Sequence, residues 1–351
     1  MPTCMIGMSG GVDSSVAACL LQEQGYDCIG VTMKLYRGAT EGSCCSLSDV
    51  EDAKSVCRRL GIPHYTFNFT EEFDRMVMGN FAAEYEAGRT PNPCIQCNRH
   101  LKFRALWQRA RELGCDFLAT GHYARILTME DGSLRLAKGA DREKDQSYVL
   151  YFLDQDQLSH TLFPLGGYTK AQVREIAAAR GFVNAKKQDS QDICFVPEGD
   201  YGAFLEAYTG KHYPPGDFID RDGNLLGRHR GAVRYTLGQR RGLGIPAASR
   251  LYVTGKDMAR NTVTLGSNQE LFTRELMASQ VNLAAPLPRG GRPMAAKVRY
   301  RQGEQPCRVY PAPEGIRVVF EVPQRAVTEG QAVVLYEGET VFGGGTIDES
   351  R

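Results

Sequence analysis

A glycine-rich segment between a predicted strand and a predicted helix constrains the fold of this chain more than any other feature. Residues 3–8 are apolar, as in a buried strand, and apolar residues at helical spacing follow Asp13. Between them lies Ser9-Gly10-Gly11-Val12-Asp13-Ser14-Ser15. Glycines let the backbone turn sharply and approach a ligand, and a helix N-terminus offers free amide groups to an anion. The segment therefore predicts a phosphate-binding loop at the end of a first strand, although an ordinary strand-to-helix turn has the same composition.

The rest of the first half alternates between the two kinds of element. Strands are predicted at 28–35, 64–69 and 117–122, and helices at 48–60, 71–86, 99–113 and 169–180. Ser48 with Glu51, and Thr169 with Gln172, form capping patterns at two helix starts. Such alternation predicts a parallel sheet covered on both faces, in an α/β fold of Rossmann-like type.

The pattern of apolar residues along the sequence changes after about residue 203. Helical periodicity fades, and short alternating segments such as 296–300, 316–322 and 332–336 are separated by turns such as 221–224. We predict three domains: an α/β domain at 1–203, a central small β-rich domain at 204–271, and a C-terminal β-barrel-like domain at 272–351.

Charge and hydropathy exclude several classes of protein. The 42 Lys and Arg nearly balance the 41 Asp and Glu, so any nucleic-acid surface has to be a local patch. Two such patches stand out, at 228–241 and 289–308. No apolar run is long enough to span a membrane, and no basic residue precedes Lys34, which argues against a signal or transit peptide. We predict a cytoplasmic protein without membrane contact, in which the 11 cysteines do not form a disulfide framework.

The glycine-rich segment differs from the two common nucleotide-binding motifs. It lacks the lysine of a Walker A loop and the spaced glycines of a dinucleotide-binding loop. It resembles instead the signature of the ATP pyrophosphatase (PP-loop) superfamily. That resemblance implies that the loop holds the pyrophosphate end of ATP with Mg²⁺, in enzymes that adenylate an oxygen of a substrate.

Three cysteines lie in polar or proline-rich segments. Cys94 and Cys97 belong to Thr90-Pro91-Asn92-Pro93-Cys94-Ile95-Gln96-Cys97-Asn98, and Cys194 follows Ser190-Gln191-Asp192-Ile193. We expect Cys97 just before a helix, whose N-terminal field would lower the pKa of its thiol. A zinc half-site is the alternative for Cys94 and Cys97, and a buried structural thiol is the alternative for Cys194.

Six segments in order resemble the bacterial tRNA-specific 2-thiouridylase family over essentially the full length of the chain. They are residues 7–14, 92–98, 119–123 (Ala-Thr-Gly-His-Tyr), 144–148 (Lys-Asp-Gln-Ser-Tyr), 190–195 and 238–244 (Gly-Gln-Arg-Arg-Gly-Leu-Gly). The resemblance implies ATP-dependent 2-thiolation of wobble uridine 34 in tRNAs for lysine, glutamate and glutamine. It implies that Cys194 bears a persulfide and that Cys97 completes sulfur release by pairing with Cys194 as a transient disulfide.

The resemblance also assigns binding residues. For ATP it points to Gly7, Met8, Ser9, Gly10, Gly11, Val12, Asp13, Ser14, Met33 and Gly121. It places Asn92, Pro93 and Cys94 at the flipped-out target base, which the chemistry also requires because a stacked uracil hides C2. It assigns other tRNA contacts to His122, Lys144, Asp145, Gln146, Arg299, Tyr300 and Gln331.

One departure and several alternatives stay open. Some family members have Asp at the position of Cys94, so an acid/base role there is in doubt. Cys94, Cys97 and Cys194 could instead ligate a [4Fe–4S] cluster. A small-molecule PP-loop ligase and a non-catalytic iron–sulfur or RNA-binding protein are the alternative functions. We expect a monomer that receives sulfur from a relay protein or directly from a cysteine desulfurase.

Overall fold

The computed structural model describes residues 1–36, 47–188, 193–196, 199–247 and 249–351. These residues divide into two compact units, each described here by itself. The first comprises residues 1–78, 94–195 and 337–342, and the second comprises 79–93, 196–336 and 343–351. The three-domain division with boundaries at 203 and 271 stays a prediction.

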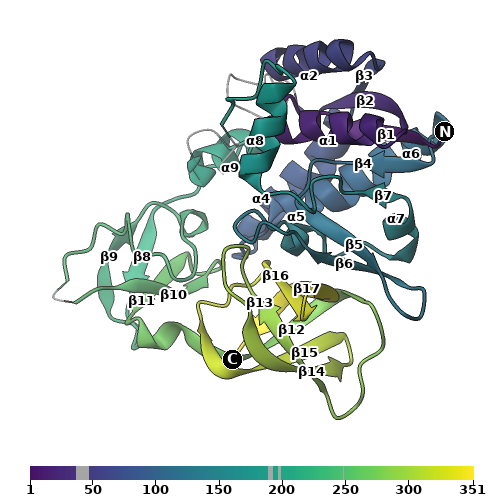
Figure 1. Cartoon of the computed structure of the whole chain (residues 1–351). Coiled ribbons are helices and arrows are strands. Elements are labelled where there is room, and N and C mark those ends of the chain that lie inside the picture. The colour runs from purple at the N-terminus through teal and green to yellow at the C-terminus, as the bar shows by residue number, and fades with distance from the viewer. Residues whose placement is uncertain (37–46, 189–192, 197–198, 248) are drawn as a thin grey trace. The chain divides into compact units, whose positions relative to one another are not determined.

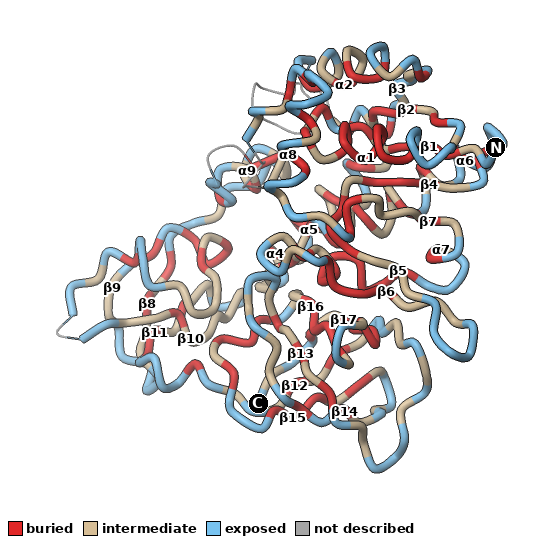
Figure 2. The backbone as a smooth tube through the Cα atoms, viewed as in Figure 1, coloured by how far each residue is buried: buried red, intermediate tan, exposed pale blue. Residues whose placement is uncertain are grey.

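The first unit is built on a five-stranded parallel sheet of order β3-β2-β1-β4-β7 (Figure 1). Its strands are β1 (Thr3–Gly7), β2 (Asp27–Lys34), β3 (His64–Asn68), β4 (Phe117–Ala119) and β7 (Thr161–Leu162). β1 lies at the centre and is buried, whereas the edge strand β3 is largely exposed (Figure 2). The predicted parallel sheet is confirmed, and its fourth strand ends at Ala119 rather than at residue 122.

Helices cover this sheet. α1 (Val12–Glu23) packs against α2 (Leu47–Leu60) and α8 (Lys170–Ala179), and its buried Val16 and Leu20 share one core with Ile6 of β1. The capping box at Thr169 and Gln172 is confirmed at the start of α8. The cap predicted at Ser48 is wrong, because α2 already begins at Leu47.

The helical segments between β3 and β4 contain two π-helical segments, η1 and η2. The predicted helix at 71–86 is α3 (Thr70–Phe73), the π-helical segment η1 (Asp74–Met78) and α4 (Gly79–Glu86). The next run consists of α5 (Pro93–Gln96), the π-helical η2 (Cys97–Leu106) and α6 (Trp107–Glu112). Smaller elements follow β4: the hairpin β5 (Ala124–Thr128) and β6 (Leu134–Lys138), the 3-10 turn η3 (Ser147–Leu150) and α7 (Gln155–Ser159).

The second unit contains α9 (Tyr201–Thr209) and two β structures. The smaller is a four-stranded sheet of order β10-β11-β8-β9, with Phe218, Val253 and Val263 in its core. Its strands are β8 (Gly216–Ile219), β9 (Leu225–His229), β10 (Tyr252–Asp257) and β11 (Thr262–Gly266), accompanied by the short turns η5 (Ala232–Arg234) and η6 (Gln269–Leu271). Asp220 accepts hydrogen bonds from the backbone and side chain of Asn224, which confirms the predicted turn between β8 and β9.

The larger β structure closes on itself. Six strands follow the order β12-β15-β14-β13-β16-β17, and β12 also pairs with β17, so the strands form a barrel. They are β12 (Phe272–Leu283), β13 (Arg292–Lys297), β14 (Gln305–Ala312), β15 (Gly315–Arg325), β16 (Ala332–Glu337) and β17 (Thr340–Ser350). The strand predicted at 296–300 ends at Lys297, which leaves Arg299 and Tyr300 in a turn.

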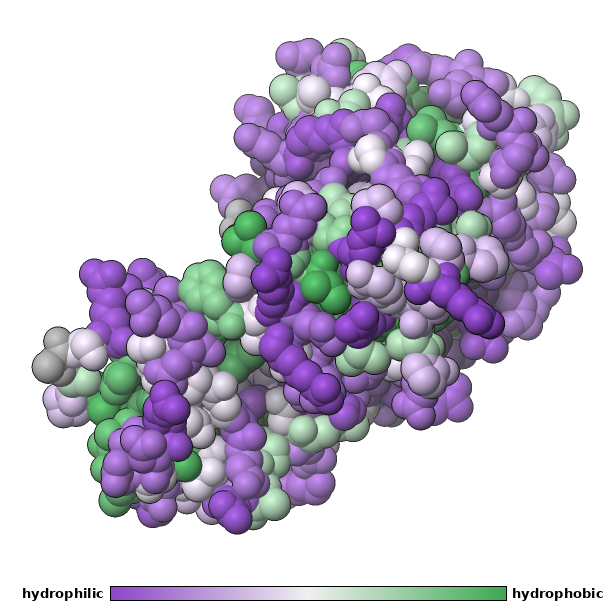
Figure 3. Space-filling view, turned by 90° about the horizontal axis from the view of Figure 1, so that it is seen from below, coloured by the Kyte–Doolittle hydropathy of each residue, from purple (hydrophilic) through white to green (hydrophobic). Residues whose placement is uncertain are grey.

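The surface offers no broad apolar face in the view of Figure 3, where hydrophobic residues occur in separate small patches among hydrophilic ones. Large exposed apolar side chains include Leu225, Phe272 and Val322. In the part of the chain that the structure describes, no helix is long and apolar enough to cross a membrane.

Candidate active site

The phosphate loop connects the end of β1 to the start of α1. Gly10 has a φ of +72°, and a Cβ there would lie 2.3 Å from the backbone oxygen of Asp49. Only glycine satisfies both conditions, because an L side chain at this φ is strained even where space is available. The hydroxyls of Ser14 and Ser15 donate to the Gly11 carbonyl at 3.1 and 3.0 Å. The loop is therefore fixed by contacts that the two serines make with its own backbone.

The backbone amides in the first turn of α1 are not capped by a side chain and can bind an anion. Gly11 is the N-cap in extended conformation, and no side chain caps the helix. Gly121 lies against this turn, where a Cβ would approach the Ser14 nitrogen to 2.8 Å. A side chain at residue 121 would cover that amide. The arrangement fits a phosphate group bound at the helix N-terminus, as the sequence predicts.

Asp13 is the acidic group of the loop, and its charge is balanced. Lys170 Nζ lies 2.8 Å from both carboxylate oxygens, and the Tyr123 hydroxyl donates to Oδ1 at 2.7 Å. Lys170 is the first residue of α8 and its side chain is only 12% exposed. The sequence analysis did not single out Lys170, although the cap at Thr169 located the turn from which it projects.

A second set of contacts links the loop to the chain segment that leads toward Cys194. Asn184, which is buried, donates to the Gly10 carbonyl and the Ser15 hydroxyl, both at 2.9 Å. Lys187 Nζ lies 2.6 Å from Asp49 Oδ1, 2.6 Å from Asp52 Oδ2 and 3.3 Å from the Gly10 carbonyl. Burial opposes the charge of Lys187, but its hydrogen bonds to the two carboxylates outweigh burial and raise its pKa. Neither residue was found by sequence reasoning, because their partners are more than 130 positions away.

The three predicted functional cysteines differ in how far they are exposed. Cys94 is exposed, and Cys97 and Cys194 are half-buried. The expected position of Cys97 just before a helix is wrong, because the helical run begins at Pro93. Proline is favoured at a first helical position, and the field of a helix N-terminus fades after the first turn. Cys94, rather than Cys97, therefore lies where that field acts.

Cys194 is held by aromatic neighbours. The Tyr36 hydroxyl donates to the Cys194 carbonyl at 2.9 Å, and Phe195 meets Phe73 edge to face with 5.7 Å between ring centroids. Tyr36 lies just after β2 and also stacks on Phe73. The predicted motif residues Ser190, Gln191 and Asp192 lie outside the described residues. The thiol segment is thus anchored on the strand next to β1, at the sheet edge where the phosphate loop begins.

The described residues contain no preassembled metal site. No three His, Cys, Asp or Glu side chains come together as ligands among them, and Cys94, Cys97 and Cys194 belong to this described set. The three thiols as they stand do not fit a [4Fe–4S] cluster. For Mg²⁺, Asp13 is the carboxylate of the phosphate loop, with 32% of its side chain exposed.

The other predicted ATP residues surround this loop. Gly7 ends β1, Met8 and Val12 are buried, Ser9 is exposed, and Met33 is half-buried near the end of β2. The backbone of Met8 is tied to β2 through its bond to the Val31 carbonyl at 2.7 Å. These residues are brought together at one edge of the sheet, and their roles in ATP binding stay a prediction.

Several residues that the resemblance assigns to tRNA make hydrogen bonds within the protein. His122 is buried and lies 2.7 Å from the Thr120 hydroxyl through Nδ1, and burial holds its pKa well below the ordinary value. Asp145 is buried and accepts from the Gly139 and Ser147 amides. Gln146 accepts from the Tyr123 amide at 3.0 Å, and Lys144 is half-buried. In this conformation Asp145 stabilises its own loop, and the tRNA contacts stay a prediction.

The second unit contains other residues that the resemblance assigns to tRNA. Arg299 donates to the Ala326 carbonyl, and Gln331 donates to the Thr90 carbonyl at 2.7 Å. Thr90 begins the segment that leads to Asn92, Pro93 and Cys94. Tyr300 is 37% exposed. Gln331 and the segment predicted at the target base are therefore neighbours, which their separation of 241 positions could not reveal.

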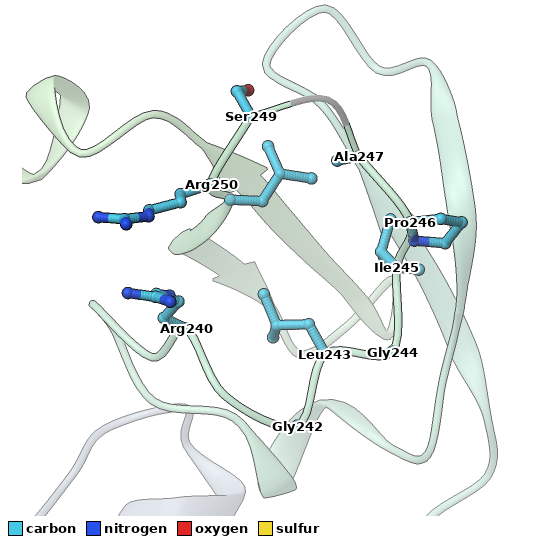
Figure 4. A pocket seen from close by; sticks show the side chains of 10 residues that line it. Arg240, Gly242, Leu243, Gly244, Ile245, Pro246, Ala247, Ser249 and Arg250 are labelled. Carbon is cyan, nitrogen blue, oxygen red and sulfur yellow. The ribbon is translucent and has the colours of Figure 1, made fainter.

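The first basic patch is partly neutralised. Arg228 pairs with Asp217 at 2.7 Å, and Arg234 pairs with Glu206 at 2.8 Å. Arg240 and Arg250 instead extend side by side from the rim of a hollow of about 450 Å³ that Leu243 and Leu251 line (Figure 4). This hollow lies in the four-stranded domain of the second unit, and the residues that line it do not belong to the phosphate loop.

Comparison with known proteins covers almost the whole chain. Residues 2–198 match the family described as tRNA methyl transferase HUP domain, 202–267 the tRNA methyl transferase PRC-barrel domain, and 273–347 the Aminomethyltransferase beta-barrel domain. The chain is 50% identical over 355 residues to the tRNA-specific 2-thiouridylase MnmA of Lachnoclostridium phytofermentans, and 99% of each chain is covered. It is 49% identical to the protein of the same name from Acetivibrio thermocellus, with 98% of each covered, and 48% identical to that from Clostridium acetobutylicum, also with 98% of each covered.

Proposed function

This chain belongs to the tRNA-specific 2-thiouridylase family, and from that premise we propose that it is an ATP-dependent sulfurtransferase acting on wobble uridine 34. The tRNAs would be those for lysine, glutamate and glutamine. The observation that supports the proposal most strongly is the phosphate loop, whose Gly10 backbone and uncapped α1 N-terminus fit a pyrophosphate group. Full-length identity near 50% to named 2-thiouridylases supports the choice of acceptor.

The first step activates the base. A carbonyl oxygen is a poor leaving group, so uracil O2 attacks the α-phosphate of ATP and pyrophosphate departs. The amides at the start of α1 would bind the departing pyrophosphate, and Lys170 supplies a positive charge beside them at Asp13. Mg²⁺ would be held by the phosphates with Asp13 and would neutralise the charge that develops on them.

The second step transfers sulfur. The terminal sulfur of a Cys194 persulfide attacks C2, and the C2–O bond breaks as AMP leaves. The sulfur is then joined to both C2 and Cys194 Sγ. The Cys97 thiolate attacks Sγ, which releases 2-thiouridine and leaves a Cys97–Cys194 disulfide. An external thiol reductant restores both thiols, and a persulfide donor, either a relay protein or a cysteine desulfurase, reloads Cys194.

The two thiols need to approach each other for this step. A disulfide requires Cα atoms within roughly 7 Å. We propose that the Cys194 segment moves toward Cys97 during turnover. We also propose that the protein acts as a cytoplasmic monomer.

The test is a reconstituted reaction. The protein is incubated with ATP, Mg²⁺, a persulfide source and unmodified glutamate tRNA, and the digested nucleosides are analysed by mass spectrometry. Exchange of one oxygen for sulfur at the wobble uridine, lost in Cys97→Ser and in Cys194→Ser, is the expected result. Release of AMP without a thiolated nucleoside would contradict the proposed acceptor and favour a small-molecule ligase.

Cys94→Ser serves as the matched variant. It removes an exposed thiol three positions from Cys97, and we expect thiolation to slow without being abolished, because the residue is predicted at the target base but the proposed sulfur path does not use its thiol. Loss of activity in this variant, together with a brown anaerobic preparation absorbing near 400 nm, would favour the iron–sulfur alternative.

A further inference from the structure

We infer that Asn184 is a positioning residue of the ATP site, whose side chain aims two backbone amides of the phosphate loop at the pyrophosphate group. The identity of the ligand rests on the proposed function, whereas the contacts are those of the structure. Asn184 lies in the turn that follows α8, 174 positions from Gly10. Both residues belong to the first unit.

The Gly10 carbonyl is turned into the protein. It accepts a hydrogen bond from Asn184 Nδ2 at 2.9 Å and a longer one from Lys187 Nζ at 3.3 Å. The peptide bond that follows Gly10 is trans, and the carbonyl and the N–H of a trans peptide point in opposite directions. The Gly11 amide therefore points away from Asn184. Within the described part of the chain this amide donates to no protein group, so it can bind a ligand.

Asn184 also fixes the next peptide, through Ser15. Its Nδ2 donates to the Ser15 hydroxyl at 2.9 Å, and that hydroxyl donates to the Gly11 carbonyl at 3.0 Å. A hydroxyl has one proton, so the bond that it accepts from Asn184 leaves this proton for the Gly11 carbonyl. The Val12 amide, in the same peptide as that carbonyl, consequently points away from Ser15. Consecutive backbone N–H groups held in this way form a site for an anion.

The side-chain amide of Asn184 can face the loop only through its nitrogen. A backbone carbonyl accepts hydrogen bonds and cannot donate them, so Gly10 requires Nδ2 on its side. Both protons of Nδ2 are used, for Gly10 and for Ser15. The Oδ1 atom is buried and has no partner among the described groups. A buried acceptor without a partner destabilises the fold, which favours a role in ligand binding over one in stability.

The turn that carries Asn184 is fixed on α1. Phe182 is buried in the same core as Val16 of that helix. The Lys187 amide donates to the Asn184 carbonyl at 2.9 Å, which closes the turn. Because α1 starts at the phosphate loop, the Asn184 side chain acts on the loop from a point with little freedom to move.

The test measures the binding of Mg²⁺-pyrophosphate and of adenosine to tRNA-free protein by titration calorimetry. Asn184→Leu keeps the approximate size of the side chain but cannot donate, and Asn98→Leu is the matched control. Asn98 is also buried, its Nδ2 donates to the Val149 carbonyl, and its Oδ1 likewise has no partner among the described groups. In Asn184→Leu we expect the Kd for pyrophosphate to rise about tenfold and the Kd for adenosine to stay within about twofold. In Asn98→Leu both constants should stay within about twofold.

Two further variants test the path of the effect. Because Asn184 acts partly through Ser15, the combination of Asn184→Leu with Ser15→Ala should weaken pyrophosphate binding less than the product of the two single effects. Effects that multiply would contradict the link through Ser15. Asn184→Thr keeps one donor and should raise the Kd for pyrophosphate about threefold. This variant carries the test if Asn184→Leu does not fold.

Three outcomes would overturn the inference. Pyrophosphate binding that is unchanged in Asn184→Leu would show that the loop does not need this side chain. Equal losses for pyrophosphate and adenosine would indicate a general disturbance of the fold. A parent protein that does not bind pyrophosphate would remove the ligand altogether. If the parent protein binds pyrophosphate but forms no thiouridine, the proposed acceptor fails, while the binding constants still decide the role of Asn184.

Discussion

Replacing Lys187 by methionine should destabilise the phosphate loop through the carboxylates it leaves behind. The ammonium group lies within hydrogen-bond distance of Asp49, Asp52 and the Gly10 carbonyl. Methionine fills much of the same volume without the charge. Lys186→Met is the matched control, because Lys186 is the exposed neighbouring lysine.

The size of the effect follows from burial. Removing one partner of a buried pair costs about 3–5 kcal/mol when the remaining charge stays buried, and far less when water reaches it. The Asp49 side chain is 11% exposed, whereas that of Asp52 is 30% exposed, so only Asp49 stays poorly solvated. Because Lys187 itself is 34% exposed and screened, we expect a loss of about 2 kcal/mol.

Scanning calorimetry at pH 7.5 measures this loss. We expect the first unfolding transition of Lys187→Met to fall by about 4–8 °C, and that of Lys186→Met by less than about 1 °C. Adding Asp49→Asn to Lys187→Met should recover about half of the loss, because it removes the unpaired charge. The raised pKa of Lys187 makes its contribution complete below the unfolded pKa near 10.4 and lost only as pH rises through the higher folded pKa, so the result should be the same at pH 6 and pH 8.5. Equal transitions for the two lysine variants, or no recovery with Asp49→Asn, would refute the reasoning.

Three further predictions concern the same unit. Gly10→Ala should reduce ATP-dependent pyrophosphate release more than tenfold. Gly25 also has a positive φ, +87°, but nothing lies within 4 Å of a Cβ built there. Gly25→Ala should therefore cost only about 1–2 kcal/mol of backbone strain and keep activity. Burial lowers the pKa of His122, so below about pH 6.5 the unfolded state binds a proton at this residue that the folded state does not bind. Stability should therefore fall as pH drops below about 6.5. His122→Asn should flatten that part of a profile of melting temperature against pH. Lys170→Met should raise the KM for ATP about tenfold in a pyrophosphate-release assay, because it leaves the negative charge of Asp13 uncompensated at the phosphate loop. Lys170→Arg should bring the KM most of the way back to the parent value. An unchanged KM in Lys170→Met would exclude this role.

Local signals predicted the elements of the first unit well. The apolar run at residues 3–8, the glycines at 10 and 11 and the capping box at Thr169 each act within a few residues, and β1, the phosphate loop and α8 were found where they predict. The start of the helical run at Pro93 was missed. The local signal there is weak, because the Pro-Asn-Pro composition is typical of a loop, yet proline is also favoured at a first helical position.

The sequence by itself determined the alternating α/β order, the glycine that the phosphate loop requires and the reactive residue types, because these depend on backbone preferences and on spacing along the chain. The tertiary structure alone decided which distant groups meet. It placed Lys187 between Asp49 and Asp52, Lys170 on Asp13, and Gln331 on Thr90. Those contacts join residues 135 to 241 positions apart, and no local preference encodes such a contact, because it forms only when the tertiary fold brings two distant segments together.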